Sequence, residues 1–241
     1  MNVRYIGALL LYAAIGRSQA AFEVASVKPL PGNVFRAGIL ISGNRVTASG
    51  PLNHLIQLAY NLKDYQVVGG PDWATSGNLL YEVMAKVEGE APPARQEVRE
   101  MLQNLLAERF RLSIHRATKE LPVYSLVIGQ DGPKLKKSAP DAKMDSTFMS
   151  GPASRITATE TVPSLANQLE LATGLPVLDK TGLSGPYEIK LEWSSDDGPV
   201  GITSDPSLFA ALQKQLGLKL QASRELLPVL VIDHVEKPSE N

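Results

Sequence analysis

The residue types best suited to chemistry are sparse in this sequence. It holds three histidines, His54, His115 and His234, and no cysteine. His234 and Glu236 are two residues apart and would share one face of a strand, as a pair of metal ligands could. A protein metal site needs three or four converging ligands, and no second cluster accompanies this pair. We therefore predict structural roles for the histidines and no metal site.

The stretch Asp179-Lys-Thr-Gly182 invites two catalytic interpretations. It matches the phosphorylated aspartate motif of ion-pumping ATPases, and Lys180-Thr-Gly182 matches one element of serine β-lactamases. Each interpretation needs a further feature that the sequence lacks. The ATPases need a membrane domain, and the β-lactamases need a Ser-x-x-Lys nucleophile motif. A polar turn between strands accounts for these residues, and we predict that turn.

Other catalytic signatures are absent from the sequence as well. No Gly-x-Ser-x-Gly elbow and no glycine-rich phosphate loop occurs, although a triad assembled in space leaves no trace in linear order. We predict no catalytic residue and no cofactor from the sequence.

The surface candidate for binding is the run Gly69-Gly70-Pro71-Asp72-Trp73. Two glycines and a proline define a turn, and a tryptophan just beyond it could be displayed as a contact anchor, because tryptophan is favoured at binding hot spots. The alternative is that Trp73 folds back and covers the sheet, since large aromatic side chains are more often buried. Gly69, Gly70, Pro71 and Trp73 are the predicted contact residues.

Composition and the first residues bear on partners and location. The 241 residues are 44% apolar with a formal charge of -1, so no excess of positive charge is available for nucleic acid. Residues 1–20 have an early arginine, a short apolar run and small residues at the end, which is typical of a secretory signal peptide. The apolar run is shorter than the roughly 20 residues that span a bilayer. We predict a periplasmic or secreted protein with no stable membrane insertion after cleavage.

The chain contains an internal repeat. Residues 98–128 match residues 204–234 at a shift of 106, and residues 45–59 match residues 155–169 at a shift of 110. The shared positions are mainly apolar and follow helical or strand spacing. They align Leu102, Leu106 and Phe110 with Leu208, Leu212 and Leu216.

The repeat predicts the fold class. Each copy reads as strand, helix, strand, strand, helix, strand, strand, which gives an α+β fold of two tandem related units, each a small mixed sheet with two helices on one face. The predicted boundaries are a signal peptide at 1–20, a first unit at 21–130, a linker at 131–154 and a second unit at 155–241. The linker is assigned because it lacks periodicity.

The run Phe22–Pro29, the turn Gly69–Trp73 and the helix Met101–Phe110 resemble the family of secreted proteins of soil bacteria called domain of unknown function 3738. This resemblance implies no activity, and fusion of some relatives to a membrane metallopeptidase implies a sensing or binding part. Each half is also similar to the short N-terminal domain of secretins and TonB-dependent receptors, through the spacing of Leu165, Gly174 and Leu208. That second resemblance implies a periplasmic contact module without catalysis.

The expected function is therefore a non-enzymatic, exported binding module for a peptide, a protein or an envelope component, with strand addition at a sheet edge as its route. Two alternatives stay open. One is a hydrolase of envelope polymers with its site at the seam between the repeats, and the other is an extracytoplasmic sensor domain.

Overall fold

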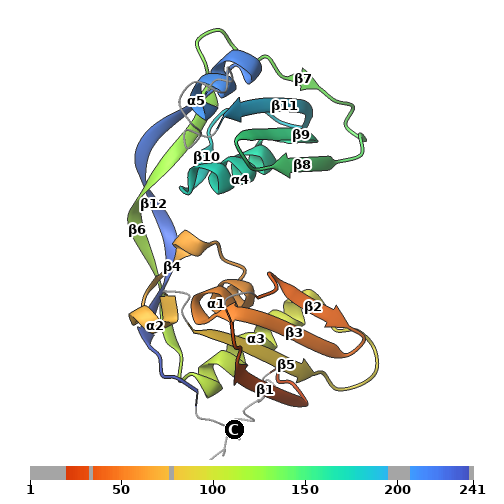
Figure 1. The fold of residues 1–241 in the computed structure, drawn as a ribbon, viewed down its shortest axis with the longest axis vertical. Coiled ribbons are helices and arrows are strands. Elements are labelled where there is room, and N and C mark those ends of the chain that lie inside the picture. Colours follow the sequence, from red (N-terminus) through yellow and green to blue (C-terminus); the bar gives the residue numbers. More distant parts are fainter. Residues whose placement is uncertain (1–19, 33–34, 76–78, 195–206, 239–241) are drawn as a thin grey trace, which may run out of the picture. The chain divides into compact units, whose positions relative to one another are not determined.

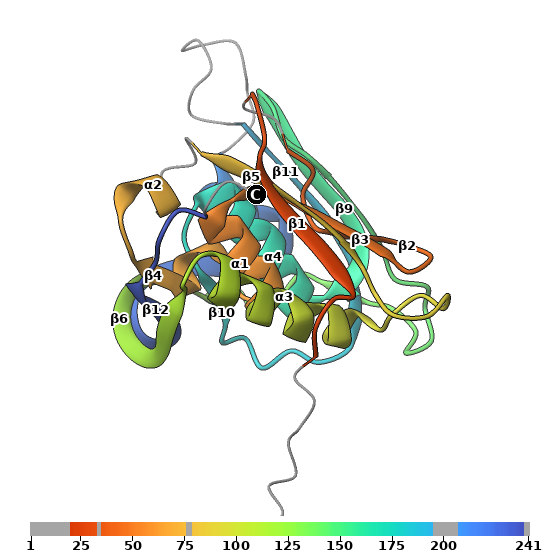
Figure 2. The same cartoon turned by 90° about the horizontal axis from the view of Figure 1, so that it is seen from below.

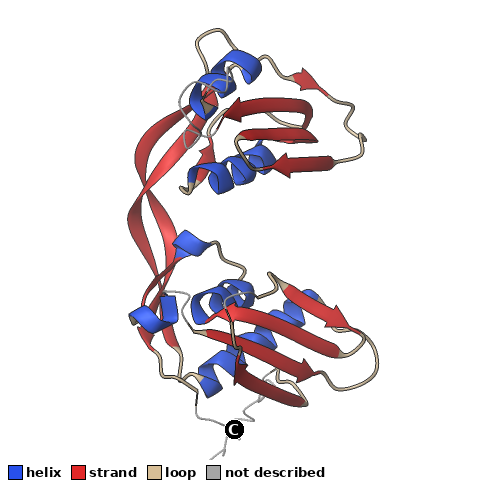
Figure 3. Ribbon diagram, viewed as in Figure 1, coloured by secondary structure: helices blue, strands red, loops and turns tan. Residues whose placement is uncertain are grey.

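The computed structural model describes residues 20–32, 35–75, 79–194 and 207–238. The predicted signal peptide falls almost wholly on residues outside the described ones. Small β-sheets and a few helices make up the described chain (Figure 3), and this confirms the α+β class. The chain divides into two compact units, one formed by residues up to His115 together with those from Leu230, the other by Arg116–Val229.

The first unit has a four-stranded sheet in the order β1-β5-β3-β2, and every neighbouring pair in it is antiparallel. We call it sheet A. Helices α1 and α3 cover one of its faces (Figures 1 and 2). The strands are β1 (Val24–Pro29), β2 (Ile39–Ser42), β3 (Arg45–Pro51) and β5 (Leu80–Lys86), and the helices are α1 (Leu52–Tyr60), α2 (Asp72–Thr75) and α3 (Arg95–Arg109).

Alternation along the strands decides which face of sheet A meets the helices. Val46 and Ala48 of β3 and Val83 of β5 are buried in the core beneath α1 and α3. The residues between them, such as Thr47 and Met84, point to the opposite face, because successive strand side chains alternate. We call that opposite face the outer face of sheet A.

The second unit has a four-stranded antiparallel sheet in the order β7-β11-β9-β8, here called sheet C. Its core side includes Ile156, Ile189 and Leu191, which are packed with residues of α4. The strands are β7 (Lys136–Lys137), β8 (Asp145–Met149), β9 (Ala153–Thr161) and β11 (Pro186–Ser194). The helices are α4 (Val162–Thr173), α5 (Leu208–Ala211) and the π-helical turn η2 (Leu212–Leu216).

A third sheet has the order β10-β6-β12-β4. Its short strands are β4 (Val67–Gly69), which follows the 3₁₀ turn η1 (Asp64–Gln66) and pairs in parallel with β12, and β10 (Val177–Asp179), which pairs in parallel with β6. Its long strands are β6 (Ser113–Ile128) and β12 (Leu218–His234). Strand β6 begins in the first unit and ends in the second, and β12 does the reverse.

The long strands correct two predictions. Each was expected as two strands separated near a proline, but each is continuous through Pro122 or Pro228. A proline is tolerated where its missing N–H is not needed, and β10 pairs with β6 only at Tyr124–Leu126, beyond Pro122. The prediction also ended the first unit at residue 130 and made the second unit one uninterrupted segment. The structure differs, because the end of β12 packs in the first core through Leu230 and Ile232.

The predicted linker at residues 131–154 also differs from the structure. It contains β7 and β8, the two outermost strands of sheet C. Strand pairing relies on backbone hydrogen bonds, so it needs no apolar periodicity. Only Phe148 of β8 packs against the second core, which explains why the sequence pattern did not reveal a strand.

Candidate functional site

The predicted glycine turn is built by close packing of β4 against β12. Gly69 and Gly70 both have positive φ angles, 80° and 79°. A Cβ atom on Gly69 would lie 3.1 Å from the Ile232 oxygen, and one on Gly70 would lie 3.2 Å from the Ile232 side chain. Trp73 is half-buried against the first core, and the Lys237 ammonium lies 5.8 Å from its ring centre. These contacts give the glycines a packing role. Trp73 is neither fully displayed at the surface nor fully buried over the sheet.

The histidines lie in separate places. His115 Nδ1 contacts the Asp233 carboxylate at 2.8 Å, and His234 Nε2 contacts Glu236 at 2.9 Å. Both pairs are largely exposed, so they contribute little to stability. Over the described residues, no three potential metal ligands of the His, Cys, Asp or Glu type come together.

The stretch Asp179–Gly182 forms a polar turn. One Asp179 carboxylate oxygen accepts hydrogen bonds from the Thr181 backbone N–H at 2.9 Å and from its hydroxyl at 2.7 Å. Lys180 makes an ion pair with Glu225. The aspartate is thus engaged in holding its own turn, as expected for a local side-chain to backbone motif.

Glu160, a deeply buried carboxylate, was not identified from the sequence. Glu160 is 2% exposed and accepts hydrogen bonds from Ser164 Oγ at 2.6 Å and Gln168 Nε2 at 2.7 Å. Burial raises the pKa of Glu160, while the two hydrogen bonds act in the opposite direction. A signal existed, because strand alternation places Glu160 on the same face as the buried Ile156 and Ala158.

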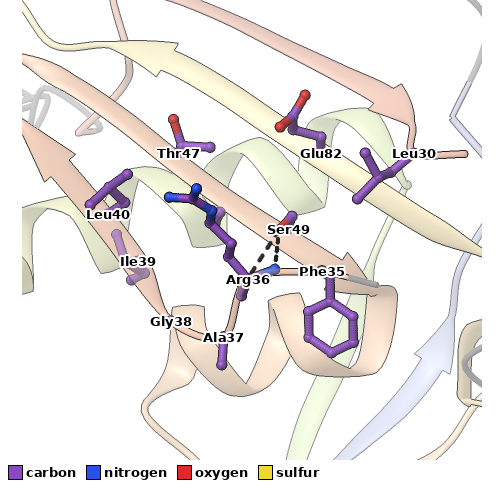
Figure 4. A pocket seen from close by; sticks show the side chains of 11 residues that line it. Leu30, Phe35, Arg36, Ala37, Gly38, Ile39, Leu40, Thr47, Ser49 and Glu82 are labelled. Carbon is purple, nitrogen blue, oxygen red and sulfur yellow. Dashed lines mark hydrogen bonds between the residues drawn. The ribbon is translucent and has the colours of Figure 1, made fainter. Parts of the chain in front are cut away.

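A cavity of about 670 Å³ opens on the outer face of sheet A. Its apolar lining includes Leu30, Phe35, Ile39 and Leu40, and its charged lining consists of Arg36 and Glu82. The size lies in the usual range for ligand pockets. Figure 4 shows the Arg36 side chain extending across the face toward Leu40 and Thr47, with Glu82 on the far side of Ser49.

The segment before β2 is fixed over this face by Ser49. The Arg36 backbone N–H donates to Ser49 Oγ at 3.2 Å, and Ser49 Oγ lies 3.5 Å from the Arg36 oxygen (Figure 4). Phe35 lies beside His54 of α1, with ring centres 5.1 Å apart. Gly50 is needed there, because a Cβ on it would lie 2.8 Å from the His54 ring and 3.0 Å from Phe35. One wall of the cavity is therefore held by specific contacts.

The outer face beside the cavity carries exposed apolar side chains. Leu40 pairs across the sheet with Thr47, and Thr47 pairs with Met84. Leu40 is 53% exposed and Met84 is 44% exposed. Val24 of β1, 62% exposed, lies on the same face. Together they make an apolar strip on a sheet face that has no helix over it in the described first unit.

Strand β2 forms one edge of sheet A. Its sequence, Ile39-Leu-Ile-Ser42, has neither a charged residue nor a proline. Ser42 and Arg45 close a two-residue turn, so the alternation of an antiparallel ladder leaves the backbone groups of Ile41 and Ile39 directed away from β3. The Arg95 guanidinium lies 3.5 Å from the Ile39 oxygen. The Ile39 carbonyl oxygen therefore already has a donor, and the edge offers the N–H groups of Ile39 and Ile41 and the Ile41 carbonyl beside the apolar strip.

The other edges of the two antiparallel sheets are protected. Strand β1 has Lys28 and Pro29, β7 consists of two lysines, and β8 begins with Asp145. Charged residues and prolines are the usual means by which edge strands avoid unwanted pairing. Among the four outermost strands that the structure describes in sheets A and C, β2 alone lacks such protection.

A family model described as "Protein of unknown function (DUF3738)" matches residues 53–235. The chain belongs to this family. The match covers the second unit and residues 53–115 and 230–235 of the first unit, and it confirms the resemblance to domain of unknown function 3738. No curated protein and no solved structure matches the chain. Within the described residues of this family member, no helix is both long enough and apolar enough to cross a membrane.

Proposed function

We propose that this protein is a non-enzymatic binding module that accepts an extended peptide segment as an additional strand along β2. The observation that carries the proposal is the combination of an unprotected apolar edge strand with the cavity beside it. Main-chain hydrogen bonds to the edge would supply affinity, and side chains entering the cavity would supply specificity, as in other strand-addition complexes.

The lining of the cavity in the first unit supports a binding module over a hydrolase. Burial raises the pKa of Glu160 in the described chain, and both of its oxygens already accept hydrogen bonds inside the second unit. The cavity on sheet A, in contrast, is mainly apolar, and its charged lining is one guanidinium and one carboxylate. An apolar lining with a few polar groups is typical of recognition. The sensor alternative agrees with the same binding surface.

We also propose that the two units are duplicates of one ancestral unit. The strand orders β1-β5-β3-β2 and β7-β11-β9-β8 correspond position by position. The registers agree with the shifts of the sequence repeat, since Ala48 pairs with Val83 and Ala158 pairs with Ile189. Duplication makes the second unit an internal reference, against which the binding features of the first unit are additions.

Export belongs to the same proposal. The pattern of residues 1–20 supports a cleaved signal peptide. The absence of cysteine means that no disulfide is required in an oxidising compartment. The resemblance of each half to the contact domains of secretins supports a role in binding a protein or peptide of the cell envelope.

Selection from a library of phage-displayed random peptides tests the strand-addition proposal. We expect the purified protein to enrich peptides, and we expect Leu40→Lys to abolish their binding, because a lysine would disrupt the apolar strip. Thr147→Lys is the matched control, since Thr147 of β8 pairs with Thr157 as Leu40 pairs with Thr47. Both positions are exposed, so each variant should keep its stability within about 0.5 kcal/mol. Failure to enrich any peptide, or equal loss in both variants, would overturn the proposal.

A further inference from the structure

We infer that the peptide bound along β2 is acidic, with an apolar side chain flanked two residues away on each side by carboxylates. This inference rests on the proposed function and specifies the ligand of the same surface. Its basis is the position of two guanidinium groups on the outer face of sheet A and the order of side chains along β2.

Guanidinium groups lie on both sides of Leu40 on the outer face of sheet A, Arg36 beside the cavity and Arg45 in the row of Ser42. The outer face and its rim also hold acidic side chains, which are Glu23, Glu82, Glu88 and Glu90, and Glu23 is already joined to Lys86 in an ion pair of 2.9 Å. The other basic side chains have no ion-pair partner among the residues that the structure describes. They are Lys28, which lies across from Glu82 of the neighbouring strand, and the two arginines, Arg36 and Arg45.

The corresponding face of sheet C is compensated within itself. Lys136 lies 2.7 Å from Glu188, and Lys190 lies 3.8 Å from Glu192. Arg155, which corresponds to Arg45, donates to the Met149 sulfur at 3.3 Å. These two lysines of sheet C are therefore compensated by carboxylates, whereas Arg155, like Arg45, has no ion-pair partner among the described residues.

The order of side chains along β2 sets the pattern expected in the ligand. A strand added beside β2 places every second side chain on the outer face. The residue beside Leu40 meets the apolar strip. Two residues along in one direction lies the row of Ser42 and Arg45, and in the other direction lies Gly38 with the Arg36 side chain nearby. Carboxylates at both flanking positions would meet guanidinium groups, which bind carboxylates well.

The predicted pattern is the same in both chain directions. An acidic residue, any residue, an apolar residue, any residue and a second acidic residue read alike forward and backward. The inference therefore holds for parallel and antiparallel addition. A lysine-flanked peptide of the same shape would place like charges together, which opposes binding.

Fluorescence anisotropy with two labelled synthetic peptides tests the inference. The probes are acetyl-Thr-Glu-Thr-Val-Thr-Glu-Thr-amide and its counterpart with both glutamates replaced by lysine. We expect the glutamate peptide to bind about tenfold or more tightly than the lysine peptide, and we expect added salt to reduce this preference. Arg36→Gln and Arg45→Gln should each reduce it, whereas Arg155→Gln, the matched change on sheet C, should leave it unchanged.

The outcomes separate the ligand class from the mode of binding. Equal binding of the two peptides would overturn the acidic pattern and leave strand addition standing. Two further glutamate peptides carry N-methyl groups at alternate backbone nitrogens, one in each of the two possible registers. One of them should bind at least tenfold more weakly than the unmodified peptide, because strand addition needs its methylated donors. Undiminished binding of both methylated registers would overturn strand addition itself. If neither unmodified peptide bound, the acidic pattern would be overturned.

Discussion

The two antiparallel sheets share a strand order but differ on the face that no helix covers. Sheet C shows lysines and glutamates that neutralise each other, with a charged residue in each outermost strand. Sheet A shows an apolar strip, unpaired basic groups and one unprotected edge. Because stability asks the same of both sheets, the difference points to a separate demand on the first. We propose that this demand is ligand binding.

A second difference lies where the central strand meets the first helix. Register and the repeat align Gly50 of β3 with Glu160 of β9, and each pairs with a tyrosine of the neighbouring strand. In the first unit the glycine leaves room for Phe35, which lines the cavity, and for the His54 ring beside it. In the second unit the glutamate fills the space and binds Ser164 and Gln168. The same position thus shapes a cavity in one unit and ties strand to helix in the other.

The largest expected effect comes from the end of the last helix in each unit, where Arg111 and Gly217 occupy matching positions with φ angles of 51° and 65°. Gly217→Ala should destabilise the protein by about 3 kcal/mol or more, since left-handed strain adds to overpacking against the Gly132 backbone. Urea unfolding measures the change. Gly174→Ala, with an open space around its φ of 69°, should lose only about 1 kcal/mol. Equal losses would contradict the packing argument.

Glu160→Ala should cost about 2 kcal/mol, because Ser164 and Gln168 would lose their shared partner. Glu160→Gln keeps an acceptor for both donors and should lose much less. Thermal unfolding followed by circular dichroism distinguishes the two variants. If the alanine variant were as stable as the glutamine variant, the carboxylate would not join β9 to α4 energetically.

Arg111→Gly is expected to stabilise the protein by about 1 kcal/mol, since a non-glycine residue in the left-handed region carries that penalty. This change makes the first unit resemble the second at the matching position. Chemical denaturation of the variant beside the natural chain gives the difference. A loss of stability would mean that the arginine side chain makes contacts that outweigh the strain.

The smallest expected effects are opposite slopes of stability with pH. Burial lowers the pKa of His54, so the unfolded chain binds that proton more tightly and stability falls as pH drops from the ordinary histidine pKa toward the lowered one. Burial raises the pKa of Glu160, so its contribution is full at low pH and is lost as pH rises through the raised pKa. His54→Phe should flatten the first slope and Glu160→Gln the second, as measured by unfolding at a series of pH values. Unchanged slopes would contradict these assignments.

The sequence revealed much of the core and little of the surface. Leu102, Leu106, Leu208 and Leu212, matched by the repeat, are all buried, because helical spacing reports directly on a packed face. Leu121 and Leu227 match equally well yet are only half-buried, since they lie near the middle of β6 and β12 and belong to neither core cluster. A repeat marks shared positions, but burial also depends on where a long strand leaves its unit.

The cavity could not be predicted from the sequence. Phe35 and Arg36 belong to a loop without periodicity, and the hydrogen bonds to Ser49 that hold it join residues 13 positions apart. The predicted turn at Gly69–Trp73 was conspicuous because glycine and tryptophan are unusual, yet its glycines serve contacts with Ile232. Residue type alone does not distinguish a close packing contact from a displayed one.

Hydrogen exchange of the backbone amides, with and without the glutamate peptide, tests most directly whether sheet A carries the binding surface. We predict slower exchange at Ile39 and Ile41 on binding, with the amides of β8 unchanged. Protection confined to β8 or to the Gly69–Trp73 turn, with none in β2, would contradict the account.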